Sequence, residues 1–323
     1  MEVIDSGIGE FLLPDPDGHR QYVREHRPRG LVDKLMSEQE AVAKFVSDGD
    51  YLCYDCNMVN RGPSSLFREV IRQRKKNLWV AGKFTYFVVN LLVGAGCVRA
   101  IDVGFMGIGP AITRALDSGE VKITEWSNTA LTMRVLAGAM GLPFLPVRFL
   151  GGSDAFRYSG AKIVKDPFTD KEITLVPALN PDVSLVHVNQ CDIYGNARIF
   201  GTSVSPVETV AAAKKVILST EEIIDTEEIR REPQRTTIPY YLVDAVVEAP
   251  FGAHPGNVPG LYAADAEAIF ELTRSGRDPE ARQAYLDKYI YGVASHQEYL
   301  EKIGVSRLLE LKRLETIKEG YYR

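Results

Sequence analysis

Cysteine and histidine are the residues through which this chain could most readily hold a metal ion or supply a nucleophile. Its four cysteines include one CxxC pair, Cys53 and Cys56, with no second pair and no histidine at ligand spacing. Its five histidines are scattered along the sequence. Protein zinc sites combine several such residues at short, regular spacings. The sequence therefore predicts no metal site, and it predicts reduced thiols rather than disulfides.

The signatures of several common enzyme classes are also missing. The chain contains no GxxxxGK[ST] phosphate loop, no HExxH helix, no GxSxG turn and no GxGxxG dinucleotide loop. Its nearest approach to the last of these is Gly94-Ala-Gly96, which lacks the third glycine and is better explained as a tight turn. Nucleotide-dependent, zinc-dependent and serine-hydrolase chemistry thus lose their usual support.

Strand and helix signals alternate from residue 34 onward. A capping box of Ser37 and Glu40 opens a helix, and Ser205 with Glu208 has the same spacing before a second one. Short apolar strands are expected at 51–54, 78–81, 98–103, 183–187, 216–219 and 244–248. This order predicts an α/β fold, an open and mostly parallel sheet flanked by helices, forming one large domain over residues 34–323. Ligands of such sheets bind beyond the carboxyl ends of the strands.

The two ends of the chain have different patterns. Residues 1–33 are rich in Pro, Gly, Arg and Asp and show no helical or strand period, so we expect an extension lying on the surface or on a partner. From Ala264 onward the sequence is polar, with tyrosines at helix-like spacings. This pattern predicts terminal helices that pack on the sheet or on a partner.

Composition narrows the class of protein. The 323 residues are 45% hydrophobic and 25% charged, which is typical of a globular protein. No apolar run approaches the roughly 18 to 20 residues that span a membrane, and the acidic start differs from a signal peptide. A net charge of −5 disfavours nucleic acid as a partner. We therefore expect a cytoplasmic protein that binds neither membranes nor nucleic acid.

Several short segments share an order and a spacing that chance agreement rarely produces. They are LPFLPV at 142–147, GGS at 151–153, DPF at 166–168, EEII at 221–224, EEIRR at 227–231, VDAVV at 243–247, APFGAHP at 249–255 and GLY at 260–262. Together they resemble the α subunit of class I CoA-transferases of the glutaconate type. The resemblance extends over roughly residues 34–310.

The resemblance implies a division of labour between two chains. An α subunit of this kind pairs with a β subunit of similar fold, as a heterodimer or an α2β2 tetramer, with the active site between them. The acyl-CoA is attacked by a glutamate of the β subunit, which is covalent catalysis, so no catalytic residue is expected in this chain. Coenzyme A is then a substrate, and no permanently bound cofactor is expected.

The α subunit would contribute binding groups and N–H donors for the charge that builds on the thioester oxygen. The loops after the first two strands are the main candidates. The predicted substrate- and CoA-binding residues are Cys56, Asn57, Asn60, Arg61, Gly82, Lys83, Asn128, Gly151, Gly152, Ser153, Gln190 and His254.

Three of these predictions have structural alternatives. Asn128 corresponds to an amide in glutaconate-type subunits and to a glutamate in a related cholesterol-ring hydrolase, but it could equally cap a helix. The segment 151–153 could be a plain turn. His254 lies between Gly252 and Pro255, and it could either contact substrate or a subunit or be satisfied by backbone carbonyls. His187, within an apolar strand, is interpreted as a structural residue.

One loop departs from the resemblance. Glutaconate-type α subunits open the loop after the first strand with two glycines and a phenylalanine, whereas this chain has Asp55-Cys56-Asn57 and keeps only Arg61 and Pro63. Side chains at glycine positions limit how closely backbone approaches a ligand. We therefore expect a substrate other than glutaconate. An acyl-CoA hydrolase or decarboxylase on the same two-chain scaffold is the second hypothesis, and a catalytically silent sensor domain is the third.

Overall fold

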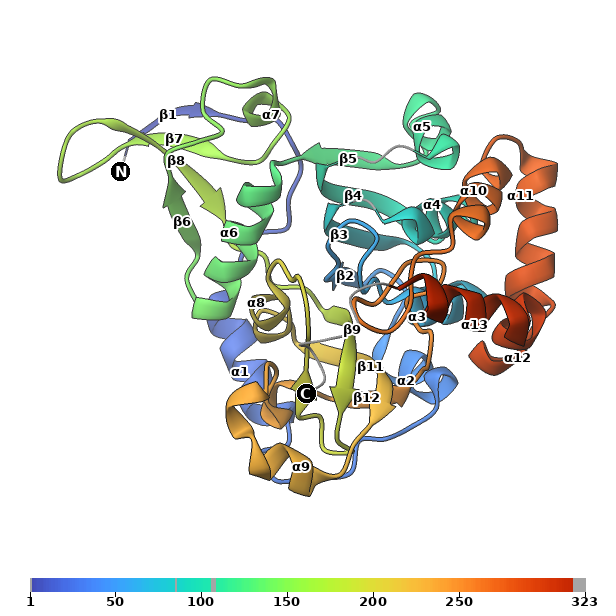
Figure 1. Cartoon of the computed structure of the whole chain (residues 1–323). Coiled ribbons are helices and arrows are strands. Elements are labelled where there is room, and N and C mark those ends of the chain that lie inside the picture. Colours follow the sequence, from blue (N-terminus) through green and yellow to red (C-terminus); the bar gives the residue numbers. More distant parts are fainter. Residues whose placement is uncertain (1, 85, 106–108, 316–323) are drawn as a thin grey trace.

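A computed structural model describes residues 2–84, 86–105 and 109–315, and its larger sheet is parallel (Figure 1). Neighbouring strands along the sheet run in the order β12-β11-β9-β2-β3-β4-β5, each pair parallel. A short strand, β10 (Ala197–Arg198), pairs antiparallel with β9. The parallel strands are β2 (Tyr51–Tyr54), β3 (Leu78–Phe84), β4 (Val98–Phe105), β5 (Lys122–Glu125), β9 (Val183–Cys191), β11 (Lys215–Ile223) and β12 (Ala245–Glu248).

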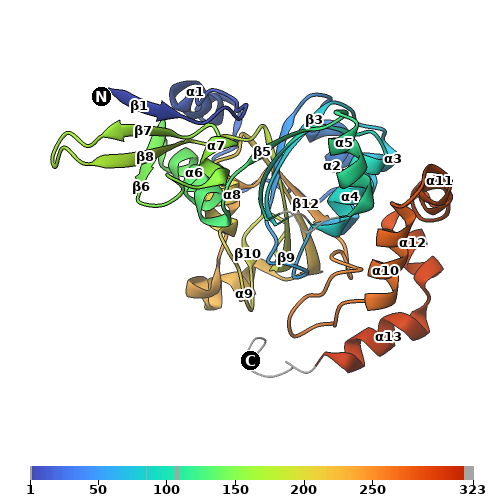
Figure 2. The same cartoon turned by 90° about the horizontal axis from the view of Figure 1, so that it is seen from above.

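The sequence-predicted strands are confirmed, each beginning within one residue of the expected position. Period-two alternation in these strands divides their side chains between two apolar layers. In β2, Leu52 and Tyr54 pack into one core cluster and Tyr51 and Cys53 into another. Helices cover both faces, as expected for a parallel sheet (Figure 2). The fold class predicted from the sequence is therefore confirmed.

The helices divide between the two faces of the sheet. One face is covered by α2, which begins with the predicted capping box, and by the helices that follow β2, β3 and β4. The other group lies on the opposite side, where α6 packs on β3 and β4, and α8 packs on α6 and β9. The first group comprises α2 (Glu38–Phe45), α3 (Ser64–Arg72), α4 (Phe87–Gly94) and α5 (Pro110–Asp117). The second group comprises α6 (Asn128–Met140) and α8 (Pro206–Ala211).

A second, antiparallel sheet was not predicted. It has the order β1-β7-β8-β6 and lies beside α6 (Figure 1). Its strands are β1 (Val3–Ser6), β6 (Phe144–Val147), β7 (Lys162–Lys165) and β8 (Glu172–Pro177), and the single-turn helix α7 (Asp154–Arg157) lies between β6 and β7.

Residues 1–33 are more ordered than their composition indicated. They include β1, which pairs with β7, and a helix, α1 (Pro16–His26). The backbone at Gly7 lies so close to Ser159 that a Cβ there would approach the Ser159 carbonyl oxygen to 2.1 Å. The segment therefore contains a helix and a strand that the sequence pattern did not indicate. All four residues of β1 are exposed, so the strand lacks the alternation that would have marked it.

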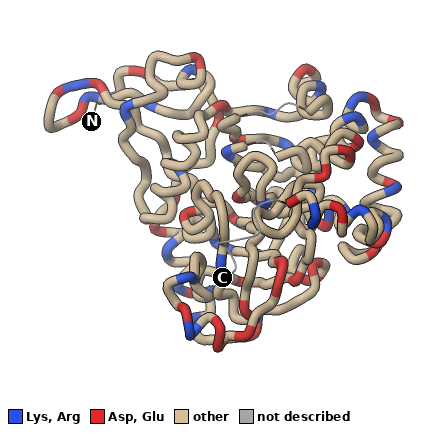
Figure 3. The backbone as a smooth tube through the Cα atoms, viewed as in Figure 1, with Lys and Arg blue, Asp and Glu red and all other residues tan. Residues whose placement is uncertain are grey.

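The chain ends in the predicted helices. These are α10 (Ala266–Ser275), α11 (Pro279–Leu286), a π-helical turn (Asp287–Tyr291), α12 (His296–Ile303) and α13 (Val305–Leu314), and they lie against α3 and α4 (Figure 1). The remaining helix, α9 (Thr226–Arg231), follows β11. No helix in the described part of the chain is long and apolar enough to cross a membrane. Basic and acidic residues alternate along the backbone rather than segregating (Figure 3).

A buried ion pair fastens α6 to the sheet. The Asp102 carboxylate on β4 accepts hydrogen bonds from Arg134 of α6 at 2.7 Å, from the Tyr51 hydroxyl at 2.5 Å and from the Trp79 indole at 3.0 Å. Arg134 and Asp102 are both fully enclosed. Such a pair contributes little net stability when intact, but removing one partner leaves an uncompensated buried charge.

Arg134→Met should therefore lower the free energy of unfolding by about 3–5 kcal/mol. Urea unfolding of the purified protein measures this loss. Lys122→Met is the matched control, because it breaks the exposed ion pair with Glu10 and should cost less than about 1 kcal/mol. Equal losses in free energy of unfolding in Arg134→Met and Lys122→Met would contradict the conclusion that the buried pair of Arg134 and Asp102 matters more than the exposed one.

Candidate active site at the carboxyl edge of the sheet

The segments that follow β2, β3, β5 and β9 lie at one edge of the parallel sheet. Because all these strands are parallel, their carboxyl ends lie side by side. The structure therefore brings together most of the predicted binding residues. These are Cys56, Asn57, Asn60 and Arg61 after β2, Gly82 and Lys83 at the end of β3, Asn128 at the start of α6 and Gln190 near the end of β9.

The centre of this edge is a buried cluster of three charges. Asp55, directly after β2, lies 3.2 Å from the Arg61 guanidinium and 3.4 Å from the Lys83 ammonium. All three side chains are enclosed. Arg61 also donates to the carbonyl oxygens of His187 at 3.2 Å and Thr202 at 3.3 Å, so it joins the loop after β2 to the end of β9.

The cluster fixes the charge of Asp55. Burial by itself would raise the pKa of this carboxyl group, but Lys83 and Arg61 together outweigh burial and hold the pKa below its ordinary value. Lys83 is in turn hydrogen-bonded to the Ser205 hydroxyl and lies 3.4 Å from that of Thr209. The predicted capping role of the Ser205 side chain was therefore wrong, because its hydroxyl serves Lys83.

The segment between Cys56 and Arg61 forms a tight turn. The backbone N–H of Asn57 donates to the Asn60 carbonyl at 3.1 Å, and the N–H of Asn60 donates back at 2.9 Å. Asn57 and Asn60 are half-buried, whereas Cys56 is enclosed and burial raises the pKa of its thiol. The two asparagines are thus the polar side chains of this turn that are partly exposed, and the cysteine is not.

Gly82 and Asn128 have specific local surroundings. A Cβ at Gly82 would lie 2.2 Å from the Tyr54 hydroxyl, so the glycine makes room for that ring. Asn128 is the first residue of α6, and the cap is Ser127, whose side chain accepts from the N–H of Ala130. The Asn128 amide oxygen lies beside Gly104 and has no hydrogen-bond partner among the residues described. The residue is half-buried, but this oxygen is enclosed, so the predicted binding role of Asn128 stays a prediction.

Three other predicted residues lie apart from this group, whereas Gln190 belongs to it. Gly151, Gly152 and Ser153 are exposed in the loop between β6 and α7, beside the antiparallel sheet, and the Ser153 side chain caps α7. Gln190 is at the carboxyl edge, where it donates to Glu222 at 2.8 Å. Their predicted binding roles stay predictions.

His254 is enclosed within the protein. Its ring nitrogens lie 2.8 Å from the Tyr299 hydroxyl and 3.2 Å from the Asp265 carboxylate, and the side chain is 0% exposed. Burial lowers the pKa of the imidazole, and the bond to Asp265 only partly offsets this. The partners are side chains of the terminal helices and the residue before them, not the backbone carbonyls considered from sequence. This arrangement favours a structural role over contact with substrate.

A second buried histidine is a hydrogen-bonded strand residue, as the sequence indicated. His187 of β9 lies 2.7 Å from the Glu221 carboxylate and 2.8 Å from the Ser219 hydroxyl, both on β11. The Tyr262 hydroxyl donates to the same carboxylate at 2.5 Å. The sequence marked Glu221 and Tyr262 only as parts of family-like segments. Nothing in their spacing of about forty residues indicated that they meet.

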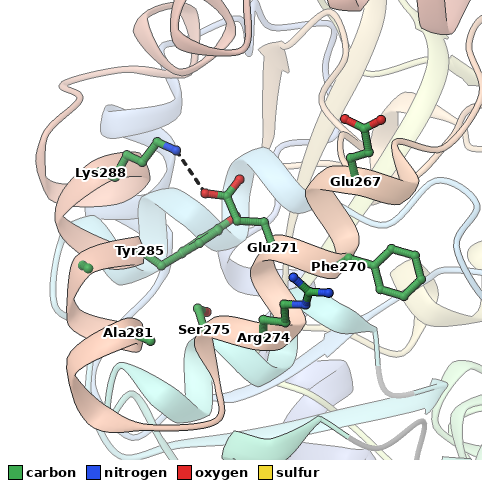
Figure 4. Close-up of a pocket in the computed structure, with 9 residues that line it drawn as sticks. Glu267, Phe270, Glu271, Arg274, Ser275, Ala281, Tyr285 and Lys288 are labelled. Atoms are coloured by element: carbon green, nitrogen blue, oxygen red, sulfur yellow. Dashed lines mark hydrogen bonds and ion pairs between the residues drawn. The ribbon is translucent and has the colours of Figure 1, made fainter.

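A hollow elsewhere on the molecule lies between α10 and α11 (Figure 4). It encloses about 670 Å³ and is bordered by Phe270, Tyr285 and the ion pair of Lys288 with Glu271. It is separate from the loops after the parallel strands and contains none of the predicted binding residues. No group of three or more His, Cys, Asp or Glu side chains suited to a metal occurs in the described ranges.

Comparison with known proteins identifies the family of this chain. The family model of coenzyme A transferases matches residues 35–249. The chain belongs to the coenzyme A transferase family. It is 31% identical to one of the subunits of glutaconate CoA-transferase from Acidaminococcus fermentans, over 87% of this chain and 95% of that relative. The crystal structure of that transferase matches with a TM-score of 0.83 over 89% of this chain and 98% of the matched chain, at 30% identity.

Other coenzyme A transferase relatives have different activities in their names. The IpdA subunit of a cholesterol ring-cleaving hydrolase from Rhodococcus jostii is 34% identical over 72% of this chain and 83% of that relative. The decarboxylase AibA/AibB matches in structure with a TM-score of 0.68 at 30% identity, over 78% of this chain and 98% of the matched chain. The resemblance to an α-type subunit is confirmed, and the family includes more than one reaction.

Asp55→Asn should destabilise the protein at neutral pH by about 3 kcal/mol, because Lys83 and Arg61 then lack their buried counter-charge. The folded pKa of Asp55 lies below its unfolded value. The stability contributed by the carboxylate is therefore complete above pH ~4 and is lost as pH falls further. Urea unfolding at several pH values should show that the difference in free energy of unfolding between Asp55→Asn and the wild type shrinks below pH ~4. A difference in free energy of unfolding that does not change with pH would contradict the conclusion that Asp55 is ionised in the folded protein.

His254→Ala should lower the free energy of unfolding by about 2–4 kcal/mol, because it leaves a cavity and two polar groups without partners. The folded pKa lies below the unfolded value near 6.5, so the fold holds the imidazole neutral. Its contribution is complete above pH ~6.5 and declines below it. The difference from the wild type should narrow between pH ~6.5 and ~5 in denaturation experiments. Unchanged stability with lost activity would restore the substrate-contact hypothesis.

Proposed function

We propose that this chain is the α subunit of a heteromeric enzyme that transfers coenzyme A between carboxylic acids. The observation that carries the proposal is the carboxyl edge itself, where the half-buried amides of Asn57 and Asn60 belong to the same loop as two members of an enclosed charge cluster. The glutaconate CoA-transferase relative, matched over most of both chains, supports the same reaction class. Coenzyme A would be a substrate, and no permanent cofactor is required.

The groups in reach of a ligand are suited to binding rather than bond formation. Asn57, Asn60 and Asn128 offer amide donors and acceptors, which can orient a thioester and stabilise charge on its oxygen. Cys56 is enclosed and its raised thiol pKa disfavours the nucleophilic thiolate. A nucleophile from a second chain is therefore part of the proposal.

The proposed reaction proceeds through a glutamate of the β subunit. Its carboxylate attacks the thioester carbonyl, the carbon–sulfur bond breaks, and an acyl-glutamyl anhydride and a CoA thiolate form. The thiolate then attacks the glutamyl carbonyl of the anhydride and releases the first carboxylic acid. The resulting glutamyl-CoA thioester passes CoA to the acceptor acid by the reverse sequence. The chain described here binds the substrate and stabilises the oxyanion.

The alternative reaction is hydrolysis or decarboxylation of an acyl-CoA, as in the names of two relatives. Asn128 bears on this choice. An amide can donate and accept hydrogen bonds, but it cannot take a proton from water as a carboxylate does. A hydrolase that relied on a glutamate at this position would lack its base here. Transfer is therefore the first choice.

The substrate should differ from glutaconate. Asp55, Cys56 and Asn57 occupy the turn where glutaconate-type subunits are glycine-rich, and the paired charges of Asp55 fix the shape of that turn. One lost oxyanion donor costs roughly a hundredfold in rate. We therefore expect an acyl group that is bulkier or differently shaped.

The test uses the chain combined with a β subunit. Glutaconyl-CoA with acetate should react slowly, a panel of cyclic and branched acyl-CoAs should contain a faster substrate, and this chain alone should be inactive. Borohydride should trap a glutamyl-CoA thioester on the β subunit. Turnover by this chain alone would refute the two-subunit proposal, and turnover with no trappable thioester would favour hydrolysis or decarboxylation.

A further inference from the structure

The segment 249–262 packs against the loop after β2 through backbone hydrogen bonds. The N–H of Arg61 donates to the Asn257 carbonyl at 2.9 Å, and the N–H of Asn257 donates to the Val59 carbonyl at 3.0 Å. The N–H of Ser65 donates to the Gly252 carbonyl at 2.9 Å. We call residues 249–262 the supporting segment, because it holds the back of the turn that carries Asn57 and Asn60.

Side chains extend the same contact. The hydroxyl groups of Ser64 and Tyr86 both lie 2.9 Å from the Ala253 carbonyl, and they lie 2.9 Å from each other. Tyr86 follows β3, so the supporting segment contacts loops from two neighbouring strands. A displacement of this segment would therefore be transmitted to the proposed binding turn.

Glu221 fastens the supporting segment near both of its ends. One carboxylate oxygen accepts from the backbone N–H of Phe251 at 2.7 Å, and the other accepts from the Tyr262 hydroxyl at 2.5 Å. The Tyr262 hydroxyl also accepts from the N–H of Ala253 at 3.2 Å. The Glu221 side chain is 6% exposed, so these bonds are formed with little competition from water.

His187 orients the carboxylate. Its Nε2 lies 2.7 Å from Glu221 and its Nδ1 lies 2.8 Å from the Ser219 hydroxyl, which fits a neutral ring that donates to the carboxylate and accepts from the serine. Ser219 is paired with His187 in the ladder of β9 and β11. Gly252 packs on the imidazole, where an added Cβ would lie 2.6 Å from the ring. The carboxylate is thus fixed to the sheet.

The arrangement resembles a Ser-His-Glu catalytic triad but cannot act as one. Ser219 and His187 are 0% exposed, and Ser219 lies inside β11 with its hydroxyl directed at the imidazole. A nucleophile must reach a substrate carbonyl. The chemistry of these residues is therefore that of a hydrogen-bonded support.

We propose that Glu221, held by His187, is a positioning residue that sets the binding turn at 57–61 through the supporting segment. The inference rests on the proposed function, since it assigns the turn to acyl-CoA binding. Glu221 acts through the bonds to Phe251 and Tyr262 and touches no substrate itself. Loosening these bonds displaces the turn and weakens substrate binding without changing the reacting groups.

Tyr262→Phe tests this with little change in shape. It removes the hydroxyl that joins Glu221 to the supporting segment and keeps the ring packed on Phe251. Tyr51→Phe is the matched control, because it removes an equally buried hydroxyl that donates to a carboxylate, Asp102, at the same distance of 2.5 Å. In the part of the chain that the structure describes, Asp102 bonds to β2, β3 and α6 and not to the supporting segment.

Steady-state kinetics of the complex with the β subunit can distinguish a displaced binding turn from a smaller amount of folded protein. A smaller folded fraction lowers kcat and leaves KM unchanged, whereas a displaced turn raises KM. We expect KM for the acyl-CoA to rise roughly tenfold in Tyr262→Phe, about the effect of one lost hydrogen bond, and not in Tyr51→Phe. Glu221→Ala should have a larger effect, and Glu221→Gln, which keeps one acceptor oxygen for the Phe251 N–H, a smaller one than Glu221→Ala.

Amide hydrogen exchange of the same complexes tests the support without reference to activity. Segments 57–65 and 250–258 should exchange faster in Tyr262→Phe, with β2 and β9 unchanged. Unchanged exchange in these segments, or equal acceleration everywhere, would overturn the proposal. A wild-type complex with no acyl-CoA turnover would refute the proposed function instead, and the exchange result would still decide whether Glu221 holds the turn.

Discussion

A buried carboxylate needs hydrogen-bond or charged partners, and in this fold the partners of three such carboxylates come from other strands and helices. These interactions therefore connect the elements of the fold. Asp55 connects β2 to the end of β3 through Lys83, Asp102 connects β4 to α6, and Glu221 connects β11 to the segment before the terminal helices. An ionised carboxylate without partners would be strongly destabilising in such surroundings. Apolar packing forms the layers, and these charges specify how the layers are joined.

At the carboxyl edge of the sheet, a rigid and enclosed group of charged side chains lies beneath partly exposed residues. Asp55 is paired with both Lys83 and Arg61, and all three side chains are enclosed. The half-buried asparagines above them can then be held in place without contributing charge of their own. Such preorganised neutral donors are suited to a charge that appears only during reaction. This division between an inner ionic layer and an outer amide layer distinguishes the edge from a nucleophilic site.

The sequence predicted the parallel sheet well because its strands are buried on both faces and give continuous apolar runs. It failed at the antiparallel sheet, where exposed strands such as β1 carry no comparable signal. The loop residues after β2 and β3 were found because parallel topology alone places them. Glu221, His187 and Tyr262 could not be found in this way, because their meeting depends on how a long return segment folds over the sheet. His254 was left open for the same reason, since its partner Tyr299 is distant in sequence.

The state of the cysteines has a practical consequence. Cys53, Cys56, Cys97 and Cys191 are all buried, and burial raises the thiol pKa of each, to about 11 for Cys53. Alkylating reagents attack the thiolate, so the folded chain offers them little to react with. A single cysteine introduced on an exposed surface would then be the preferred attachment point for a fluorophore or spin label. The binding of a partner to this chain could be followed from that point without first removing the native thiols.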